Sequence, residues 1–166
     1  MLLYLVKHSR PDIANATREL SKSMDGATEV GFQELLRVIK YVLDTENYGL
    51  KLEPKKENDM WNLEAFSDSD WAGDLADRKS VSSVHIFHGV TMIKSSSTGQ
   101  AVQALSSGEA EYVSCIKGAS LGLGCASMCE DFGMPRPTII LESDSAATKG
   151  ICSWIGLGHI RHLPTT

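Results

Sequence analysis

The sequence lacks any apolar run of membrane-spanning length. Near its start only residues 2–6 are apolar before Lys7 interrupts them, whereas a bilayer helix needs about 20 such residues. The same stretch lacks the basic leader and cleavage site of a secretory signal. Cysteine is also scarce, because only four are present and three of them fall in one predicted helix. This usage favours reduced packing residues, so we expect an intracellular protein, cytoplasmic or nuclear, with no membrane partner.

Excess positive charge is missing too. The net charge of the 166 residues is −5, of which residues 1–60 contribute −1 and residues 61–166 contribute −4. Proteins that bind nucleic acid through their own surface carry a basic patch or stripe. Any nucleic-acid role of this chain therefore requires bound cations or a neighbouring basic domain.

The first third of the chain has helical texture. Apolar spacing and turn residues predict two helices and a short strand, at residues 9–24, 29–45 and 48–54. Pro11 fits the first turn of the first helix. The charged run at 55–59 follows, and we place a domain boundary there. The expected organisation is a helical segment, residues 1–60, followed by a second domain, residues 61–166.

The second domain has the pattern of an α/β sandwich. Four strands are expected, at residues 61–68, 81–89, 90–96 and 138–143. A long helix from Ser106 to about Phe132 precedes the last of them, with a capping-box pattern at its start and Gly133 at its end. A shorter helix is expected at about 145–154. Three strands, a helix, a strand and a helix predict two packed layers.

Two of these strands run into the same sequence, Ser-Asp-Ser. Asp68 is expected at the carboxyl end of the first strand, and Asp144 follows the last strand. Ligands of open α/β sheets bind outside the carboxyl ends of the strands. If the two strands are parallel neighbours, their carboxylates converge there.

The long helix offers two further acids, Glu109 and Glu111. They lie about 200° apart around a helix, so they do not face one site equally. Glu109 has a local role available in the capping box. Glu111 instead begins a stripe of small residues, namely Cys115, Gly118, Gly122 and Cys125. Because small residues let a helix pack closely on a sheet, we favour Glu111 as the third acid of the site.

Three converging carboxylates repel one another unless a cation lies between them. Oxygen ligands suit Mg²⁺ or Mn²⁺, and two such ions about 4 Å apart activate water and clamp a phosphodiester. The candidate metal ligands are therefore Asp68, Glu111 and Asp144. The competing interpretation is that the two aspartates are turn residues or helix caps, because Ser-Asp-Ser is also turn chemistry.

Longer motifs make a family resemblance visible. The blocks FSDSDWAGDLADRKSVSS (66–83), QALSSGEAEYVS (103–114) and TIILESDSAA (138–147) resemble the ribonuclease H domain of copia-type retrotransposon Pol polyproteins. YLVKHSRPDIANATRELSKSM (4–24) and LLRVIKYVLDTENYGL (35–50) resemble the segment that joins reverse transcriptase to that domain. The resemblance covers nearly the whole chain in order.

The resemblance implies a ribonuclease H-like mixed sheet with flanking helices, preceded by a small two-helix segment. It implies two-metal hydrolysis of the RNA strand of RNA–DNA hybrids, with Asp68, Glu111 and Asp144 as catalytic residues and Mg²⁺ or Mn²⁺ as cofactor. Ser69, Asp70 and Trp71 follow the first catalytic position and are the expected nucleic-acid contacts. The expected partners are the hybrid and the reverse transcriptase part of the same polyprotein.

The sequence departs from the family pattern in two places. The family is basic before Leu-Ser-Ser, whereas residues 95–107 carry no charge here. Pro164 stands where the family has an aspartate, and the chain stops at Thr166, before the helix that supplies a fourth acid. We therefore expect a C-terminally truncated or decayed copy with impaired activity.

Three other interpretations remain open at this stage. A catalytically inactive ribonuclease H-fold domain that binds a partner fits the acidic charge. A zinc site could use Cys125 and Cys129 with His159 and His162, although the two-residue histidine gap is short. A serine hydrolase is disfavoured, because no serine lies in a nucleophile-elbow pattern.

Overall fold

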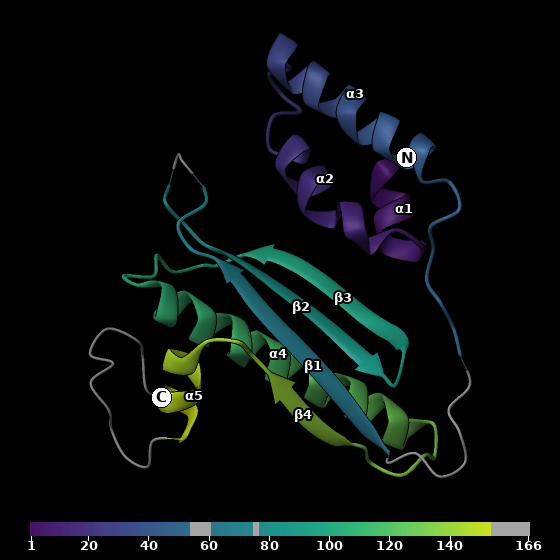
Figure 1. The fold of residues 1–166 in the computed structure, drawn as a ribbon, viewed down its shortest axis with the longest axis vertical. Helices are drawn as coiled ribbons and strands as arrows, with labels where there is room; N and C mark the ends of the chain where they lie inside the picture. The colour runs from purple at the N-terminus through teal and green to yellow at the C-terminus, as the bar shows by residue number, and fades with distance from the viewer. Residues whose placement is uncertain (54–60, 75–76, 154–166) are drawn as a thin grey trace.

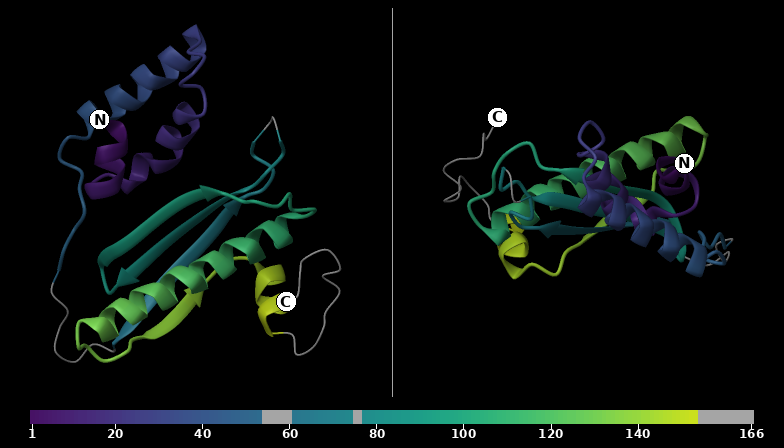
Figure 2. Two further views of the ribbon diagram at one scale, coloured as in Figure 1. Left: turned by 180° about the vertical axis from the view of Figure 1, so that it is seen from behind. Right: turned by 90° about the horizontal axis from the view of Figure 1, so that it is seen from above.

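The computed structural model describes residues 1–53, 61–74 and 77–153. A four-stranded sheet, in the order β3-β2-β1-β4, carries a long helix on one face, and a group of helices precedes it (Figures 1 and 2). The strands are β1 (Asn62–Asp70), β2 (Val81–His88), β3 (Thr91–Gly99) and β4 (Thr138–Glu142). The helices are α1 (Leu2–His8), the 3₁₀ turn η1 (Pro11–Ile13), α2 (Ala14–Ser21), α3 (Glu29–Asp44), α4 (Ser107–Asp131) and α5 (Ala146–Ser153). The predicted mixed α/β class is confirmed, and this topology is compatible with a ribonuclease H-like fold.

The sheet is mixed because its fourth strand arrives through a helix. β1 pairs antiparallel with β2, and β2 pairs antiparallel with β3. After α4, β4 pairs parallel with β1, so that Asn62 lies beside Thr138 and Phe66 beside Glu142. The two strands that run into Ser-Asp-Ser, β1 and β4, are thus parallel neighbours, which is the condition under which Asp68 and Asp144 converge.

The core lies between the sheet and α4. Alternate residues of β1 and β2 point toward the helix and are fully buried, namely Leu63, Ala65, Val84 and Ile86. α4 reaches close to them because it presents glycine: a Cβ on Gly118 would lie 3.6 Å from Ser67 Cβ, and one on Gly122 would lie 3.0 Å from Ile139 Cγ2. The stripe of small residues therefore packs against the sheet as predicted.

The predicted serine cap at the start of α4 and the predicted glycine at its end are both present. Ser106 is the N-cap, and its hydroxyl accepts a hydrogen bond from the Glu109 amide at 3.2 Å. At the other end Gly133 takes φ +75°, a backbone conformation that glycine adopts without strain. The amide of Met134 donates to the Cys129 carbonyl and that of Gly133 to the Glu130 carbonyl, which is the Schellman arrangement.

The predicted first helix, residues 9–24, is present in shorter form as η1 and α2, with Pro11 in its first turn. The helix α1 before it was not predicted, and the chain breaks between the two at Ser9 and Arg10. Pro11 explains the break, because the residue before proline avoids the helical region, and Arg10 has φ −128° and ψ 65°. The expected two-helix segment is therefore a three-helix segment.

Arg10 holds this segment together. It is only 4% exposed, and its guanidinium donates to Asp12 at 2.8 Å and to the carbonyl of Thr45 at 3.0 Å. It also lies over the rings of Tyr41 and Tyr48. The break that proline creates is thus fastened to the end of α3 by a buried cation.

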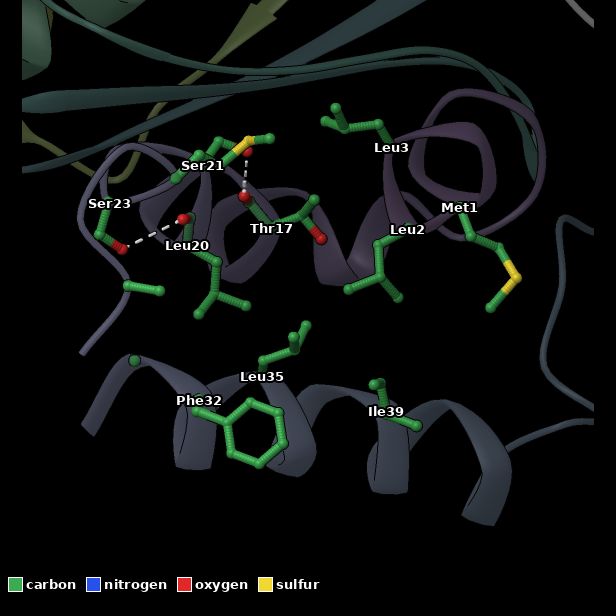
Figure 3. Close-up of a pocket in the computed structure, with 13 residues that line it drawn as sticks. Met1, Leu2, Leu3, Thr17, Leu20, Ser21, Ser23, Phe32, Leu35 and Ile39 are labelled. Atoms are coloured by element: carbon green, nitrogen blue, oxygen red, sulfur yellow. Dashed lines mark hydrogen bonds between the residues drawn. The ribbon is translucent and has the colours of Figure 1, made fainter. Parts of the chain in front are cut away.

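An apolar pocket of about 460 Å³ lies among the three helices (Figure 3). Phe32, Leu35 and Ile39 of α3 face Leu2 and Leu20 across it. Three of the apolar residues whose helical spacing predicted α3 therefore face α1 and α2 across this pocket. Within the described part of the chain, no helix has the length and apolar character needed to cross a membrane.

The predicted strand at 48–54 is also wrong over its described residues, 48–53. These residues form no regular structure, and Glu53 hydrogen-bonds to β3 through the hydroxyl of Thr91, by its amide and its carbonyl. One side chain cannot replace a ladder of backbone pairs. The proposed boundary run at 55–59 lies outside the described residues.

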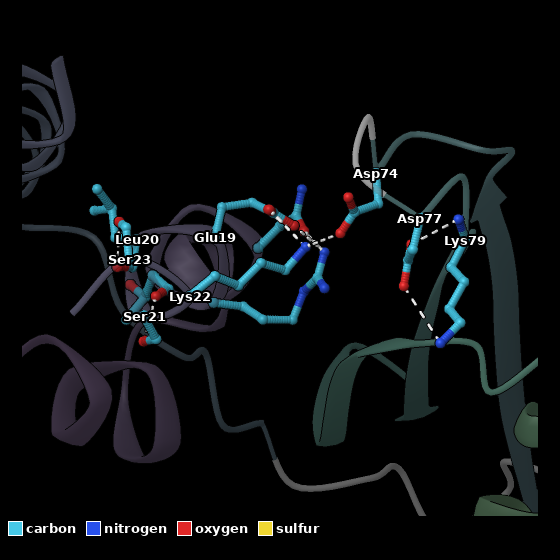
Figure 4. Close-up of polar contacts among 11 residues, drawn as sticks. Glu19, Leu20, Ser21, Lys22, Ser23, Asp74, Asp77 and Lys79 are labelled. Atoms are coloured by element: carbon cyan, nitrogen blue, oxygen red, sulfur yellow. Dashed lines mark hydrogen bonds and ion pairs between the residues drawn. The ribbon is translucent and has the colours of Figure 1, made fainter. Parts of the chain in front are cut away.

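The helical segment touches the sheet domain beside the β1–β2 turn (Figure 4). Lys22, which follows α2, donates to Asp74 at 2.6 Å and pairs with Glu19 at 2.9 Å. Ion pairs this exposed stabilise by about 0.2–1 kcal/mol. They therefore orient the two parts more than they hold them together.

Candidate metal centre

Three carboxylates meet at the carboxyl ends of β1 and β4. Asp68, Glu111 and Asp144 each offer an oxygen, and these oxygens all lie within 4.8 Å of one another. Two of the residues are exposed and Glu111 is partly buried. The same three acids were predicted from the sequence, with Asp68 at the end of its strand. β1 runs on to Asp70, so Asp68 lies within the strand and not at its end.

Glu111 is held by β1 through one of its two oxygens. Its Oε1 accepts hydrogen bonds from the amide of Ser69 at 3.0 Å and from the Ser69 hydroxyl at 2.9 Å. Its Oε2 is buried and has no hydrogen-bond partner among the described residues. Burial raises the pKa of Glu111, and the charges of Asp68 and Asp144 raise it further, while the Ser69 hydrogen bonds lower it.

This arrangement fits a hard divalent cation. A buried carboxylate oxygen without a hydrogen-bond partner costs free energy, and here it lies beside two further carboxylates. A cation in that position supplies the missing partner and relieves the repulsion among the acids. Carboxylate oxygens are the ligands that Mg²⁺ and Mn²⁺ prefer, so the residues present fit the predicted cofactor.

A second serine fixes the strand from the helix side. Ser114 of α4 is fully buried, and its hydroxyl donates to the Asp68 carbonyl at 2.6 Å. Ser69 reaches from β1 to α4, and Ser114 reaches from α4 to β1. The two serines therefore set the distance between the backbones that carry Asp68 and Glu111.

A hollow of about 420 Å³ opens beside the acids on the sheet face away from α4. Its lining includes Asp68, Asp144, Ser83 and His85. The His85 ring lies 3.1 Å from the Ser83 hydroxyl, and burial lowers the pKa of His85. His85 was not predicted from the sequence, although its alternation with the buried Val84 and Ile86 on β2 indicates the face away from α4.

The predicted nucleic-acid contacts fall into different roles. Ser69 is occupied with Glu111. Trp71 is 51% exposed while its indole N–H donates to the Ala104 carbonyl at 3.2 Å, so its ring is fixed at the surface. Asp70 lies against Gly73, where an added Cβ would come within 1.9 Å of the Asp70 carboxylate. Asp70 and Trp71 are both exposed, and of the two only Trp71 presents a ring on which a base could stack.

The competing acid has the local role expected of it. Glu109 is 7% exposed, and its Oε2 accepts from the Leu105 amide at 2.8 Å. The partner is Leu105 and not the Ser106 amide of a standard capping box. Two of the four residues considered for a zinc site, Cys125 and Cys129, lie on α4 as expected. The other two, His159 and His162, lie outside the described residues.

Curated proteins include relatives whose sequences match nearly the whole chain. The retrovirus-related Pol polyprotein from transposon RE1 of Arabidopsis thaliana is 36% identical over 163 residues, which is 97% of this chain. The corresponding polyprotein from transposon RE2 is 33% identical over the same share. The chain is homologous to one segment of retrotransposon Pol polyproteins. It spans 11% of the length of each of these two relatives.

A shorter relative has a different name. The secreted RxLR effector protein 161 of Plasmopara viticola is 34% identical over 112 residues, which is 68% of this chain and 77% of that protein. No family model and no solved structure matches the chain.

Proposed function

We propose that this chain is the ribonuclease H-like domain of a copia-type retrotransposon Pol polyprotein, which hydrolyses the RNA strand of RNA–DNA hybrids. The observation that carries the proposal is the convergence of Asp68, Glu111 and Asp144, with one Glu111 oxygen buried and unpaired. Residues 1–60 are then the connection to reverse transcriptase, which is the proposed partner in the same polyprotein, and residues 61–166 are the ribonuclease H-like domain.

Each acid has a distinct place in the proposed reaction. Divalent cations held there would activate a water and stabilise the attacking and leaving oxygens of the phosphodiester. Asp68 contributes an exposed carboxylate from the central strand, and Asp144 contributes another from the turn after β4. Glu111 is fixed by Ser69, so it offers a single oxygen in a defined direction.

We expect the substrate strand to approach on the sheet face away from α4, which covers the other face (Figure 2). The hollow beside Asp68 and Asp144 lies on this face. The helical segment borders the same face, because Pro11 and Ala14 line a neighbouring hollow with Asp68. Ser83 and His85 line that hollow and offer groups that can hydrogen-bond to a sugar or phosphate. The uncharged segment 95–107 supplies no cations, so bound metal provides positive charge for the phosphate.

A hybrid cleavage assay tests the proposal. A duplex with a labelled RNA strand is incubated with the chain and Mn²⁺, beside duplex DNA and duplex RNA of the same sequence. We expect slow, metal-dependent cleavage of RNA in the hybrid alone. Glu111→Gln should be inactive, and Asp25→Asn, which removes an exposed acid from the turn after α2, should match wild type. Cleavage that survives in Glu111→Gln would contradict the site assignment.

The second candidate is a ribonuclease H-fold domain that binds a partner without chemistry. The net charge of −5 and the similarity to a secreted effector favour it. It predicts no cleavage by either wild type or Glu111→Gln, and equal hybrid binding by the two proteins. The same assay, read together with a binding titration, therefore separates the two functions.

A further inference from the structure

A buried glutamine between β3 and α4 hydrogen-bonds to the residue before the proposed metal ligand. Gln100 follows β3 and is only 5% exposed. Its side-chain Nε2 donates to the carbonyl of Ala110 at 2.9 Å and to the hydroxyl of Ser82 at 3.0 Å. Its backbone amide donates to the Ser80 carbonyl at 2.8 Å. The side chain thus joins the first turns of α4 to β2.

Both acceptors belong to the surroundings of Glu111. Ala110 precedes Glu111 in the chain, and Ser82 lies opposite Ser69 in the β1–β2 ladder. Ser69 is the residue whose amide and hydroxyl hold Glu111. Gln100 therefore connects the backbone that carries the ligand to the strand pair that orients it.

The orientation of the amide follows from its neighbours. A backbone carbonyl only accepts hydrogen bonds, so the group that faces Ala110 has to be the NH₂. The amide oxygen then points elsewhere, and it is buried without a partner among the described residues. An apolar side chain of the same length would avoid that unsatisfied acceptor, so packing alone does not explain a glutamine here.

We infer that Gln100 is a positioning residue for the proposed metal centre, which it serves by holding Glu111 against Ser69. The inference rests on the proposed function. It also assigns a role to the uncharged segment 95–107, because that segment supports the site from behind by hydrogen bonding. Groups that orient metal ligands typically change metal affinity 10–100-fold when they are removed.

The test compares two glutamines in the same segment. Gln100→Met keeps the length of the side chain and removes both donors, whereas Gln103→Met makes the same change at an exposed position. Mn²⁺ affinity is measured by calorimetry well below the unfolding temperature of each protein. We expect Gln100→Met to bind Mn²⁺ at least 10-fold more weakly than wild type and Gln103→Met to match wild type.

A shorter amide keeps the test decisive if Gln100→Met fails to fold. Gln100→Asn retains the chemistry but is one methylene short of both acceptors, and we expect the same loss of Mn²⁺ affinity. A merely structural role would lower the free energy of unfolding and leave the affinity of the folded protein unchanged, and that result in either folded variant overturns the inference. Wild type that binds no Mn²⁺ would overturn the proposed centre itself, and this inference with it.

Discussion

Replacing Asp68 with asparagine should stabilise the protein without metal and destabilise it, relative to wild type, with metal. The three acidic oxygens lie within 4.8 Å of one another. Two unit charges at that distance repel by about 0.9 kcal/mol at the dielectric constant of water and by about 3.5 kcal/mol at an effective value of 20. Because Asp68 and Asp144 are exposed, the lower figure applies better, and Asp68 takes part in two such pairs.

We therefore expect metal-free Asp68→Asn to be about 1 kcal/mol more stable than wild type at neutral pH and low salt, with the difference shrinking as salt screens the charges. Mn²⁺ at 100 times its dissociation constant should stabilise wild type by about 2.7 kcal/mol. The variant should gain little, since it has lost a ligand. The order of the two stabilities should thus reverse when metal is added.

The assay is urea unfolding of wild type, Asp68→Asn and Asp25→Asn, each in chelator and in Mn²⁺. Asp25→Asn removes the same charge from an exposed turn, so it controls for net charge and should follow wild type in both conditions. Equal gains from Mn²⁺ in all three proteins would refute the reasoning, as would a metal-free Asp68→Asn that is no more stable than wild type.

Three further predictions follow from the packing and the pKa shifts. Gly122→Leu should lower the free energy of unfolding by about 1–3 kcal/mol, because the new side chain overpacks against β4. At Gly124 an added Cβ has open space, so Gly124→Leu should raise the free energy of unfolding by up to about 1 kcal/mol. Equal effects of the two changes in urea unfolding would contradict close packing of α4. The buried guanidinium of Arg10 lowers the pKa of the Asp12 carboxyl. The stabilisation that the ionised Asp12 gives is therefore present above the ordinary aspartate pKa and is lost as pH falls through the lowered pKa. Asp12→Asn should lack this acid-sensitive part of the free energy of unfolding, measured between pH 2 and 6. Ser69→Ala should raise the pKa of Glu111 further, because a hydrogen bond to the ionised form is lost, and should move the onset of Mn²⁺ binding in a pH titration to higher pH.

The acids of the candidate site could be predicted because local patterns determine their positions. Asp68 and Asp144 both stand in a Ser-Asp-Ser sequence after an apolar run, and the strands that carry or precede them are parallel neighbours. Glu111 was preferred to Glu109 because it begins the small-residue stripe, and α4 does pack by that stripe. Periodicity and helix packing were enough for this choice.

The supporting residues could not be predicted in the same way. Ser69 and Ser114 bind across a gap of more than 40 positions in the chain, and Gln100 reaches both α4 and β2. Such contacts depend on strand register, which periodicity alone leaves open. Helix α1 was missed for a different reason: Pro11 correctly marked the start of one helix, and the possibility that it also ends an earlier one was not considered.

In an acidic chain, the carboxylates of the proposed metal centre have to be held in place by uncharged groups. In the proposed function a phosphate has to approach three carboxylates in a protein of net charge −5, and no cation of segment 95–107 assists. Metal must then supply the local positive charge before the phosphate arrives. The positions of the carboxylates therefore have to be set before metal or phosphate binds. Hydrogen bonds from the uncharged side chains of Ser69, Ser114 and Gln100 can do so without changing the charge of the site.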